Sequence, residues 1–357
     1  MTKHKQLFKS ALLLVVSLVL MSFKTADERA AEALARRVMG GKAKAVVFEQ
    51  TNATTDFYEL EQKGKKVLIR GNNANSMAVG LNRYIQQYCL ANVSWYDYNP
   101  VELPRTMPKV PAKVSGKVEL PIRFFLNYCT FGYTMPWWKW QQWERFIDWM
   151  ALNGVNMPLA ITGQEAVWQK VWRKYGMTDE QIRAYFTGPA HLPWQRMINI
   201  DRWQGPLPQS WIDGQAELQK QILKRERELN MTPVLPAFAG HIPADLEQTV
   251  PGIRTSKVNR WCNFDEKYRC TYLNPSDPVF ARIQRTSWKS RPGCTAPIIF
   301  MVLTCSTKYH LHPGSPIRWP RFQLEYMNHC RVLIPKPFGC RWHGSSSAIR
   351  KPGHQRE

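Results

Sequence analysis

The stretch RFFLNYCTFGYTMPWWKWQQWERFIDWMALNGVNMPLAI, residues 123–161, carries the pattern that decides the fold. Its first part, RFFLNYCT, is typical of a strand. The following WKWQQWERFIDWMALNG has helical spacing, with Trp140, Trp143, Ile147 and Met150 along one face and Gly154 as a stop signal. VNMPLAI then predicts a second, buried strand. The sequence therefore predicts a strand, a helix and a strand in succession.

The same alternation continues further along the chain. QEAVWQKVWRKYG predicts a helix over residues 164–176, a long polar helix is expected over 210–229, and MTPVLPAF predicts a third strand at 231–238. Strands that alternate with helices indicate a parallel sheet, and the (β/α)₈ TIM barrel is the leading form. We expect residues 122–286 to form part of such a barrel.

A smaller α/β domain is expected before the barrel, at residues 27–100. Helical spacing predicts helices at 30–38 and 75–89, and KAVVFEQ and KVLIRG have the β-branched clustering of strands. Four prolines between residues 100 and 111 indicate a linker at 101–121. The expected fold class is therefore α/β, with this small domain preceding an incomplete TIM barrel.

The N-terminus has the layout of a secretory signal peptide, assigned to residues 1–26. Lys3, Lys5 and Lys9 precede an apolar run at 11–21, which is too short to span a bilayer as a helix. We expect export to a periplasmic or extracellular location, with no stable membrane insertion after cleavage; an uncleaved anchor is the alternative. Export would allow disulfides, and the sequence leaves their pairing open.

The composition changes sharply at the end of the chain. Residues 287–357 contain no Asp and two Glu, but eleven Lys and Arg, four of the eight Cys and five of the eight His. The net charge of +22 would suggest an anionic partner. The part before residue 287 has no long basic run or nucleic-acid motif, so we expect no nucleic-acid binding.

Aromatic and amide side chains follow each predicted barrel strand, in NYCTFGY, ITGQE and AFAGHIP. The loops after the strands form the active face of a TIM barrel. Aromatic rings stack on the apolar face of a sugar and amides bond its hydroxyls. Trp194 and Trp261 stand in irregular segments and suit a ligand, whereas four others are expected to fill the barrel–helix interface: Trp137, Trp138, Trp140 and Trp143.

Five segments between residues 123 and 282 resemble the alpha-N-acetylglucosaminidases of glycoside hydrolase family 89. They are NYCTFGYTMPWWKWQQWERFIDWMALNGVN, GQEAVWQKV, YFTGPAHLPWQRM, QGPLPQSW and MTPVLPAFAGHIP. The resemblance implies an exo-acting, retaining hydrolase that removes terminal α-linked N-acetylglucosamine from glycans. No cofactor is expected, and the implied partner is a glycan with that terminal sugar.

The resemblance also implies a sugar pocket built from six residues: Asn127, Cys129, Tyr133, Trp194, Met197 and Trp261. Asn127 would bond hydroxyls, and Cys129 would line the pocket without acting as a nucleophile. Glu165 is interpreted as a structural residue at a helix start. His241 is interpreted as a pocket or core group, and no metal site is expected because no metal-ligand spacing is present.

The catalytic carboxylates that the resemblance implies are absent from this reading frame, so the site has no catalytic residue. Retaining hydrolysis needs two carboxylates, and the family's acid/base Glu follows Asn in a motif expected shortly after residue 284. Reading the codons one base off forces Gly across Met301 and Val302, and permits the motif Tyr-Gly-Ala-Asp-Leu-Phe-Asn-Glu from residues 300 to 308. The tail at 287–357 is therefore predicted to be out of frame and not natively folded, with the nucleophile beyond residue 357.

The leading hypothesis is thus an alpha-N-acetylglucosaminidase represented by an inactive, truncated fragment. A non-catalytic sugar-binding remnant is the first alternative. A basic polyanion-binding protein, which would use the positive charge, is the second. The natural glycan, the oligomeric state and the origin of the frame slip are left open by the sequence.

Overall fold

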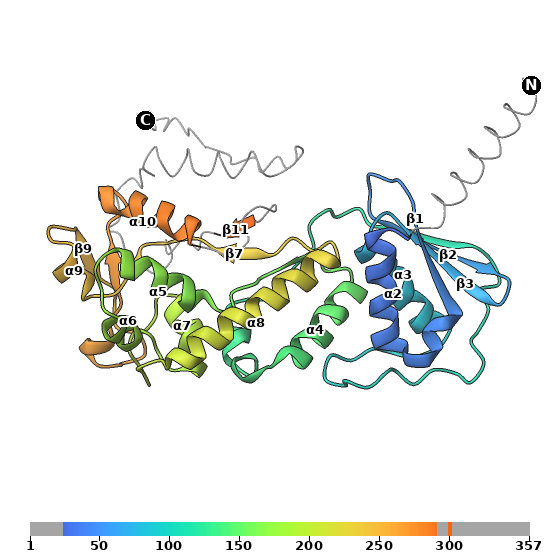
Figure 1. The fold of residues 1–357 in the computed structure, drawn as a ribbon, viewed down its shortest axis with the longest axis horizontal. Helices are drawn as coiled ribbons and strands as arrows, with labels where there is room; N and C mark the ends of the chain where they lie inside the picture. Colours follow the sequence, from blue (N-terminus) through green and yellow to red (C-terminus); the bar gives the residue numbers. More distant parts are fainter. Residues whose placement is uncertain (1–23, 291–298, 302–357) are drawn as a thin grey trace, which may run out of the picture. The chain divides into compact units, whose positions relative to one another are not determined.

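The N-terminal domain is a four-stranded sheet with two helices (Figure 1). The structure is a computed structural model that describes residues 24–290 and 299–301. The strand order is β1-β3-β2-β4, with β1 parallel to β3 and the other pairs antiparallel. Its elements are α2 (Ala26–Met39), η1 (Gly40–Ala45), β1 (Val46–Gln50), β2 (Phe57–Lys63), β3 (Lys66–Gly71), α3 (Ala74–Gln87) and β4 (Val114–Lys117).

Local sequence explains where α2 begins. The Thr25 hydroxyl accepts a hydrogen bond from the Glu28 amide, and the Glu28 carboxylate accepts one from the Thr25 amide. This capping box satisfies amides that would otherwise lack partners at the helix start. The helix is therefore longer than the expected 30–38.

The expected linker at 101–121 needs a correction. β4 lies inside it and pairs with β2, with Leu60 opposite Val114 and Phe57 opposite Lys117. The sequence prediction failed because VSGK carries little strand propensity; pairing with an exposed edge of the sheet decides the conformation. The strand β2 itself, FYELEQK, was not predicted either.

Four short strands of the second domain run parallel to one another: β5 (Phe124–Phe125), β6 (Met157–Pro158), β7 (Val234–Pro236) and β11 (Ile299–Met301). β5 pairs with β6, and β7 pairs with β11. A parallel bridge between Leu159 and Val234 joins the two pairs. The expected TIM-barrel strands are therefore adjacent and in order, although all three are shorter than the expected 123–130, 155–161 and 231–238.

Helices separate the successive parallel strands, and the last helix before each strand is α4 (Trp140–Leu152), α8 (Gln209–Glu228) or α10 (Pro278–Lys289). The alternating pattern predicted α4 and α8, whereas α10 was not predicted. α4 buries Trp143, Ile147 and Met150. The chain leaves it through Gly154, whose φ of 76° lies in the left-handed region that glycine adopts without cost. α10 runs past the expected domain end at residue 286.

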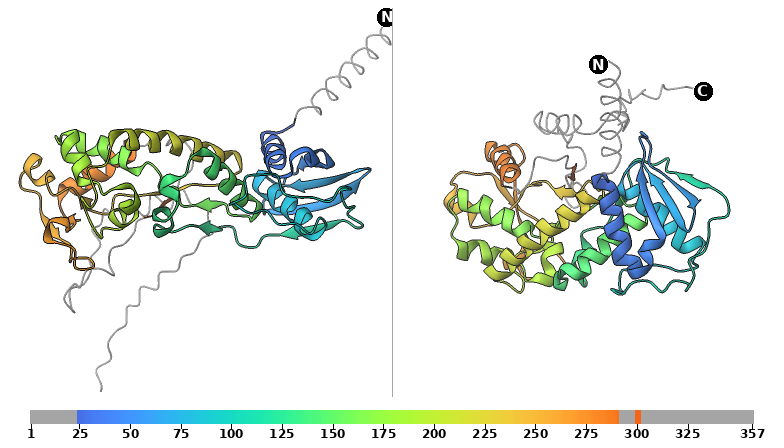
Figure 2. Two further views of the ribbon diagram at one scale, coloured as in Figure 1. Left: turned by 90° about the horizontal axis from the view of Figure 1, so that it is seen from below. Right: turned by 45° about the vertical axis from the view of Figure 1, so that its right-hand side comes forward.

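Additional elements are inserted after β6 and β7, where the C-terminal ends of the strands lie. The first insertion contains α5 (Gln164–Lys174), α6 (Asp179–Tyr185), η4 (Pro189–His191) and α7 (Leu192–Arg196). The second forms the antiparallel sheet β8-β10-β9 with β8 (His241–Ile242), α9 (Leu246–Thr249), β9 (Thr255–Lys257), η5 (Glu266–Tyr268) and β10 (Thr271–Leu273). Figure 2 shows both insertions on the part of the fold that also carries α10.

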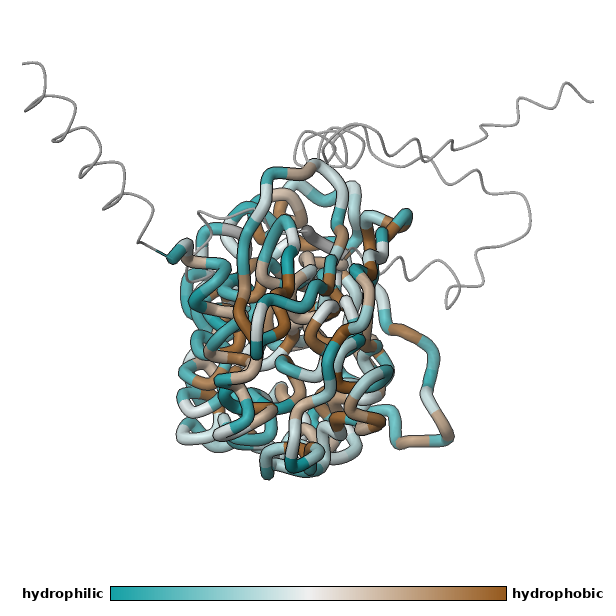
Figure 3. Tube along the Cα trace, turned by 90° about the vertical axis from the view of Figure 1, so that its right-hand side faces the viewer, coloured by the Kyte–Doolittle hydropathy of each residue, from teal (hydrophilic) through white to brown (hydrophobic). Residues whose placement is uncertain are grey.

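The two domains share one hydrophobic core. Leu34 and Leu81 of the first domain belong to the same cluster as Ile147 and Val234 of the second. The amide of Asn75, on α3, donates to the Val155 carbonyl across this boundary at 2.8 Å. In Figure 3 hydrophobic residues lie toward the middle of the trace and hydrophilic ones on the outer turns.

No helix within the described ranges is long and apolar enough to cross a membrane. Four cysteines of residues 24–290 are free thiols: Cys89, Cys129, Cys262 and Cys270. The expected signal peptide and most of the expected out-of-frame tail lie outside the described residues. Of the tail, the structure describes the end of α10 and the strand β11.

Candidate sugar site at the strand ends

The loop after β5 carries three of the six expected site residues. It folds into two short 3₁₀ helices, η2 (Cys129–Gly132) and η3 (Met135–Trp137). Asn127 is exposed, and its Oδ1 accepts a hydrogen bond from the Thr130 amide at 3.1 Å. That bond shapes the start of η2. Tyr133, just past η2, is 65% exposed and its ring is accessible to a ligand.

The structure brings three expected residues together in what we call the aromatic cluster: Tyr133, Trp194 and Trp261. The Tyr133 and Trp194 rings lie 6.3 Å apart at 73°, and the Trp194 and Trp261 rings lie 6.5 Å apart at 34°. The three residues come from three different segments: the turn after η2, the helix α7, and the irregular segment between β9 and η5. Such rings form the apolar surface that a pyranose needs for stacking.

Two sulfur atoms adjoin this cluster. Cys129 Sγ lies 4.0 Å from Met197 Sδ, and both side chains are partly buried. Met197 stands three residues after Trp194, one helical turn further on. Contacts therefore join five of the six expected residues in two groups, the three rings and the two sulfur side chains, and Asn127 stands two residues before Cys129.

Gly132 allows the close approach of η2 and α7. A Cβ atom on Gly132 would lie 2.5 Å from Cζ3 of Trp194 and 3.0 Å from Cγ of Pro193. No ordinary carbon–carbon contact is that short. The glycine in NYCTFGY is thus required for the position of the Trp194 ring.

A buried ion pair lies behind α7. Arg196 donates from Nε and Nη2 to the two carboxylate oxygens of Glu165, each at 2.8 Å. The side chains of Arg196 and Glu165 are 9% and 3% exposed. Glu165 lies in the first turn of α5, as the structural interpretation expected, and both of its oxygens are occupied. Sequence reasoning missed Arg196, although it follows Trp194 in the quoted HLPWQRM segment.

The residues next to this pair form a second buried network. His241 Nε2 lies 2.8 Å from Asp201 Oδ1, and the Gln195 amide donates to the same oxygen at 3.2 Å. Tyr185 packs beside His241, with ring centroids 5.4 Å apart. Burial, and then the nearby charge of Asp201, raise the pKa of Tyr185 well above its ordinary value. His241 is therefore a partner of a buried carboxylate.

Asp201, His241 and Cys270 form a candidate metal site, because their ligand atoms lie within 4.8 Å of one another. Carboxylate, imidazole and thiolate are ligands of Zn²⁺. Two ligands of a tetrahedral zinc, at bond lengths of roughly 2.0–2.1 Å, lie about 3.3 Å apart. The 2.8 Å between His241 and Asp201 is instead a hydrogen-bond distance. The geometry fits a hydrogen-bonded pair better than a zinc site.

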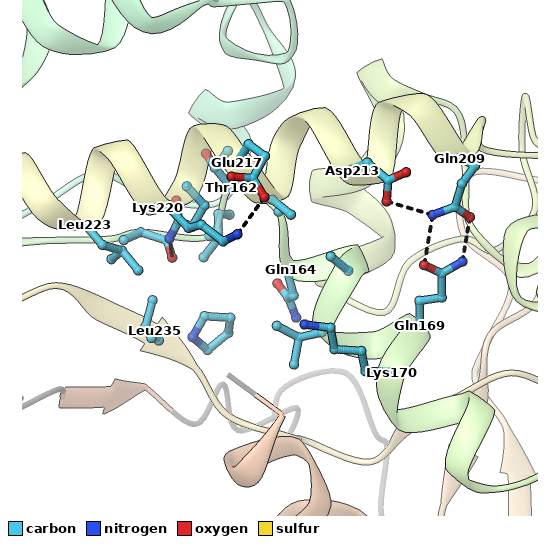
Figure 4. A pocket seen from close by; sticks show the side chains of 18 of the residues that line it. Thr162, Gln164, Gln169, Lys170, Gln209, Asp213, Glu217, Lys220, Leu223 and Leu235 are labelled. Atoms are coloured by element: carbon cyan, nitrogen blue, oxygen red, sulfur yellow. Dashed lines mark hydrogen bonds and ion pairs between the residues drawn. The ribbon is translucent and has the colours of Figure 1, made fainter. Parts of the chain in front are cut away.

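A cavity of about 640 Å³ lies elsewhere, between α5, α8 and β7 (Figure 4). Amide and charged side chains line it, and Gln169 and Gln209 form a reciprocal amide pair at its edge. None of the six expected site residues contributes to its lining. It also lacks the exposed ring faces that distinguish the aromatic cluster.

One expectation about the tryptophans is wrong. Trp143 is 2% exposed and packs against Trp138, as an interface residue should. Trp137, however, is 61% exposed and meets only the edge of Trp211, with ring centroids 5.6 Å apart. Trp137 ends η3, in the turn before α4, and most of its surface is exposed there.

Comparison with known proteins identifies the family. Residues 123–291 match the alpha-N-acetylglucosaminidase (NAGLU) tim-barrel domain, and residues 29–109 match the N-terminal domain of the same family. Together these ranges take in well over half of the chain. The chain belongs to the alpha-N-acetylglucosaminidase family. The resemblance found in the sequence is therefore confirmed, as is the order of a small N-terminal domain and a TIM-barrel domain.

Among curated proteins, the family member alpha-N-acetylglucosaminidase of Homo sapiens is 43% identical over 227 residues. The match covers 63% of this chain and 30% of the human protein. The matched part of this chain thus corresponds to less than a third of the length of the human protein.

Solved structures of the same family agree. A family 89 glycoside hydrolase from Clostridium perfringens, in complex with 2-acetamido-1,2-dideoxynojirmycin, has a TM-score of 0.68 and 33% identity. A form of that enzyme in which two glutamates are replaced by glutamine, in complex with its substrate GlcNAc-alpha-1,4-galactose, also has a TM-score of 0.68, with 32% identity. Each covers 74% of this chain and 31% of the relative.

Proposed function

We propose that this chain carries the amino-terminal part of the sugar pocket of an exo-acting alpha-N-acetylglucosaminidase. The observation that carries the proposal is the meeting of Tyr133, Trp194 and Trp261, with the Cys129–Met197 contact beside them, beyond the ends of parallel strands. The ligand would be a glycan that ends in α-linked N-acetylglucosamine. The rings would stack on the sugar, and Asn127 would bond a hydroxyl.

We propose that the frame-corrected gene encodes an enzyme that hydrolyses the glycosidic bond with retention of the α configuration. It needs an acid/base and a nucleophilic carboxylate about 5–5.5 Å apart. The relative solved with its substrate carries glutamine in place of two glutamates, which supports a mechanism with two carboxylates. Glu165 is not proposed as either of them, since Arg196 engages both of its oxygens.

We further propose that this chain binds the sugar without hydrolysing it. In the neighbouring frame the codons of Thr307 and Lys308 permit the acid/base Glu, and the nucleophile would follow later in the gene. The nucleotide sequence around codons 282–290 tests the frame. An uninterrupted single frame through these codons, read in independent clones, would contradict the slip.

The binding test uses the 357-residue chain and N-acetylglucosamine, followed by calorimetry or tryptophan fluorescence. Trp194→Ala should weaken binding at least about tenfold, because a central ring of the pocket is lost. Trp137→Ala is the matched control: it removes an exposed tryptophan outside the cluster and should leave the affinity unchanged. Equal affinities for both variants would refute the assignment of the pocket.

A hydrolysis test separates the alternatives. With a nitrophenyl α-N-acetylglucosaminide, the chain as written should release no nitrophenol above the rate of the blank. Release that disappears in Glu165→Gln would overturn the proposal and make Glu165 the catalyst. Salt-sensitive binding to heparin without sugar binding would support the polyanion alternative.

A further inference from the structure

The short helix α7 has two differently occupied faces. Trp194 and Met197, one turn apart, contact the aromatic cluster and Cys129. Gln195 and Arg196, between them, turn the other way into the protein interior, where their side chains are almost fully enclosed. The positions of Trp194 and Met197 therefore depend on the contacts that hold Gln195 and Arg196.

Among the described acidic side chains, only Glu165 forms an ion pair with Arg196. Both N–H···O distances are 2.8 Å, which is the fork geometry of a bidentate guanidinium–carboxylate pair. Glu165 belongs to α5, a helix of eleven residues anchored by the fully buried Val171 and Trp172. The pair thus ties a five-residue helix to a larger and better packed one.

Gln195 is held on the neighbouring side. Its Oε1 accepts from the Thr187 amide at 3.0 Å, and its Nε2 donates to the Tyr185 carbonyl at 2.8 Å and to Asp201. The amide group uses its acceptor and both donors, so it is tied to the segment before α7 and to the one after it. α7 is consequently fixed from two directions.

The backbone directly after Met197 is strained. Ile198 is a buried β-branched residue with φ of 61°, a conformation such residues rarely adopt. Strain of this kind persists only where surrounding contacts over-determine it, and it is concentrated at functional sites. The side-chain contacts of Gln195 and Arg196 add to the backbone hydrogen bonds that close this turn.

We propose that Glu165 is a positioning residue of the sugar pocket, acting through Arg196 to fix α7 so that Trp194 and Met197 present a preset surface to the ligand. The role in sugar binding rests on the proposed function. The fixing of α7 does not, and it has a readout of its own.

The first experiment measures hydrogen exchange in the full chain without sugar. The double variant Glu165→Gln/Arg196→Met removes both charges together, so no unpaired charge is left buried. The amides of Met197, Ile198 and Asn199, which close the turn, should exchange at least about tenfold faster than in the parent chain. Unchanged exchange in these amides would overturn the proposal.

The matched control removes another buried bidentate pair, in Arg37→Met/Asp148→Asn. Arg37 and Asp148 join α2 to α4, two helices outside the α5–α7 insertion. This control should leave exchange in the 192–199 segment unchanged. If it accelerates exchange there equally, the effect is a general loss of stability and the proposal fails.

The second experiment measures affinity for N-acetylglucosamine. The Glu165→Gln/Arg196→Met variant should bind about 10–100-fold more weakly, because the side chains of Trp194 and Met197 would then have to be ordered on binding. Arg196→Lys keeps the charge but not the fork, and it should fall between the parent and the double variant. If the double variant no longer unfolds cooperatively, Arg196→Lys is used in its place in both experiments.

The two experiments separate two kinds of failure. A parent chain that does not bind the sugar refutes the proposed function, while hydrogen exchange still decides the positioning role. A parent chain that binds, with an affinity unchanged in the double variant, refutes the positioning role and leaves the proposed function standing.

Discussion

Asp148 of α4 accepts two hydrogen bonds from Arg37 of α2, at 2.6 and 2.7 Å, across 111 residues of sequence. The Asp148 side chain is 1% exposed. The contact joins the N-terminal domain to the barrel at a point where the two share a core. It shows that α2 of the N-terminal domain supports the barrel helix α4.

We predict that Arg37→Met lowers the free energy of unfolding by about 3 kcal/mol, because it leaves a buried carboxylate without its main partner. Arg225, whose Nη1 lies 3.8 Å from Asp148 Oδ1, compensates only in part. Denaturant unfolding measures the change. Lys220→Ala, which breaks an exposed pair with Glu217, is the control and should cost at most about 1 kcal/mol. Equal effects would show that the pair between the domains contributes little.

Gly132→Ala should displace the Trp194 ring, since its new Cβ would lie 2.5 Å from Cζ3 of that ring. We expect a loss of about 1–3 kcal/mol in stability from overpacking, and binding of N-acetylglucosamine about tenfold weaker. Gly214→Ala is the matched control: it lies within α8 with nothing within 4 Å of its Cβ. It should stabilise the protein by about 0.5–1 kcal/mol and leave sugar binding unchanged. Weakened binding in both variants would contradict the role of Gly132.

Glu226 should make stability depend on pH. It is 1% exposed near the C-terminal end of α8, and its Oε2 has no hydrogen-bond partner in the described structure. Burial raises its pKa well above the ordinary 4.5. The unfolded chain therefore releases this proton at a lower pH than the folded one. The stability that the protonated group contributes is complete below pH 4.5 and declines as the pH rises toward the folded-state pKa.

Replacing Glu226 by Gln should remove this decline and raise stability at pH 8 relative to the parent by on the order of 1–3 kcal/mol. Denaturant unfolding at several pH values from 5 to 8 measures it. Glu217→Gln, on an exposed turn of the same helix, should leave the pH profile as it is. A parent profile that rises from pH 5 to 8, and is unchanged in Glu226→Gln, would contradict the prediction.

Restoring the frame near codon 286 should produce an active, retaining enzyme. We expect the Glu encoded across Thr307 and Lys308 to serve as acid/base, and its replacement by Gln to lower the rate about 10²–10⁴-fold on substrates with poor leaving groups. The effect should be smaller on activated substrates. The stereochemistry of the released N-acetylglucosamine is followed by nuclear magnetic resonance, and an inverted product would refute the mechanism.

Much of this architecture could be predicted from the sequence, because the spacing of hydrophobic residues differs between helices and strands. The predicted ends of the helix Trp140–Leu152 lie within two residues of the observed ones. Those of the helix Gln209–Glu228 lie within one residue. Strand β4 and the exposure of Trp137 were not predictable in this way. The first depends on a partner strand far away in the chain, and the second on the direction in which a turn leaves η3.

The sequence by itself determined the alternation of the first three barrel strands with helices, the family, and the segments that carry Asn127, Cys129, Tyr133, Trp194, Met197 and Trp261. Only the tertiary structure decided that Glu165 pairs with Arg196, 31 residues away, and Asp201 with His241, 40 residues away. The physical reason is that the spacing of hydrophobic residues indicates which side of a helix or strand is buried. The partner of a buried charged side chain depends on how separate elements pack against one another, and the local sequence does not indicate that packing.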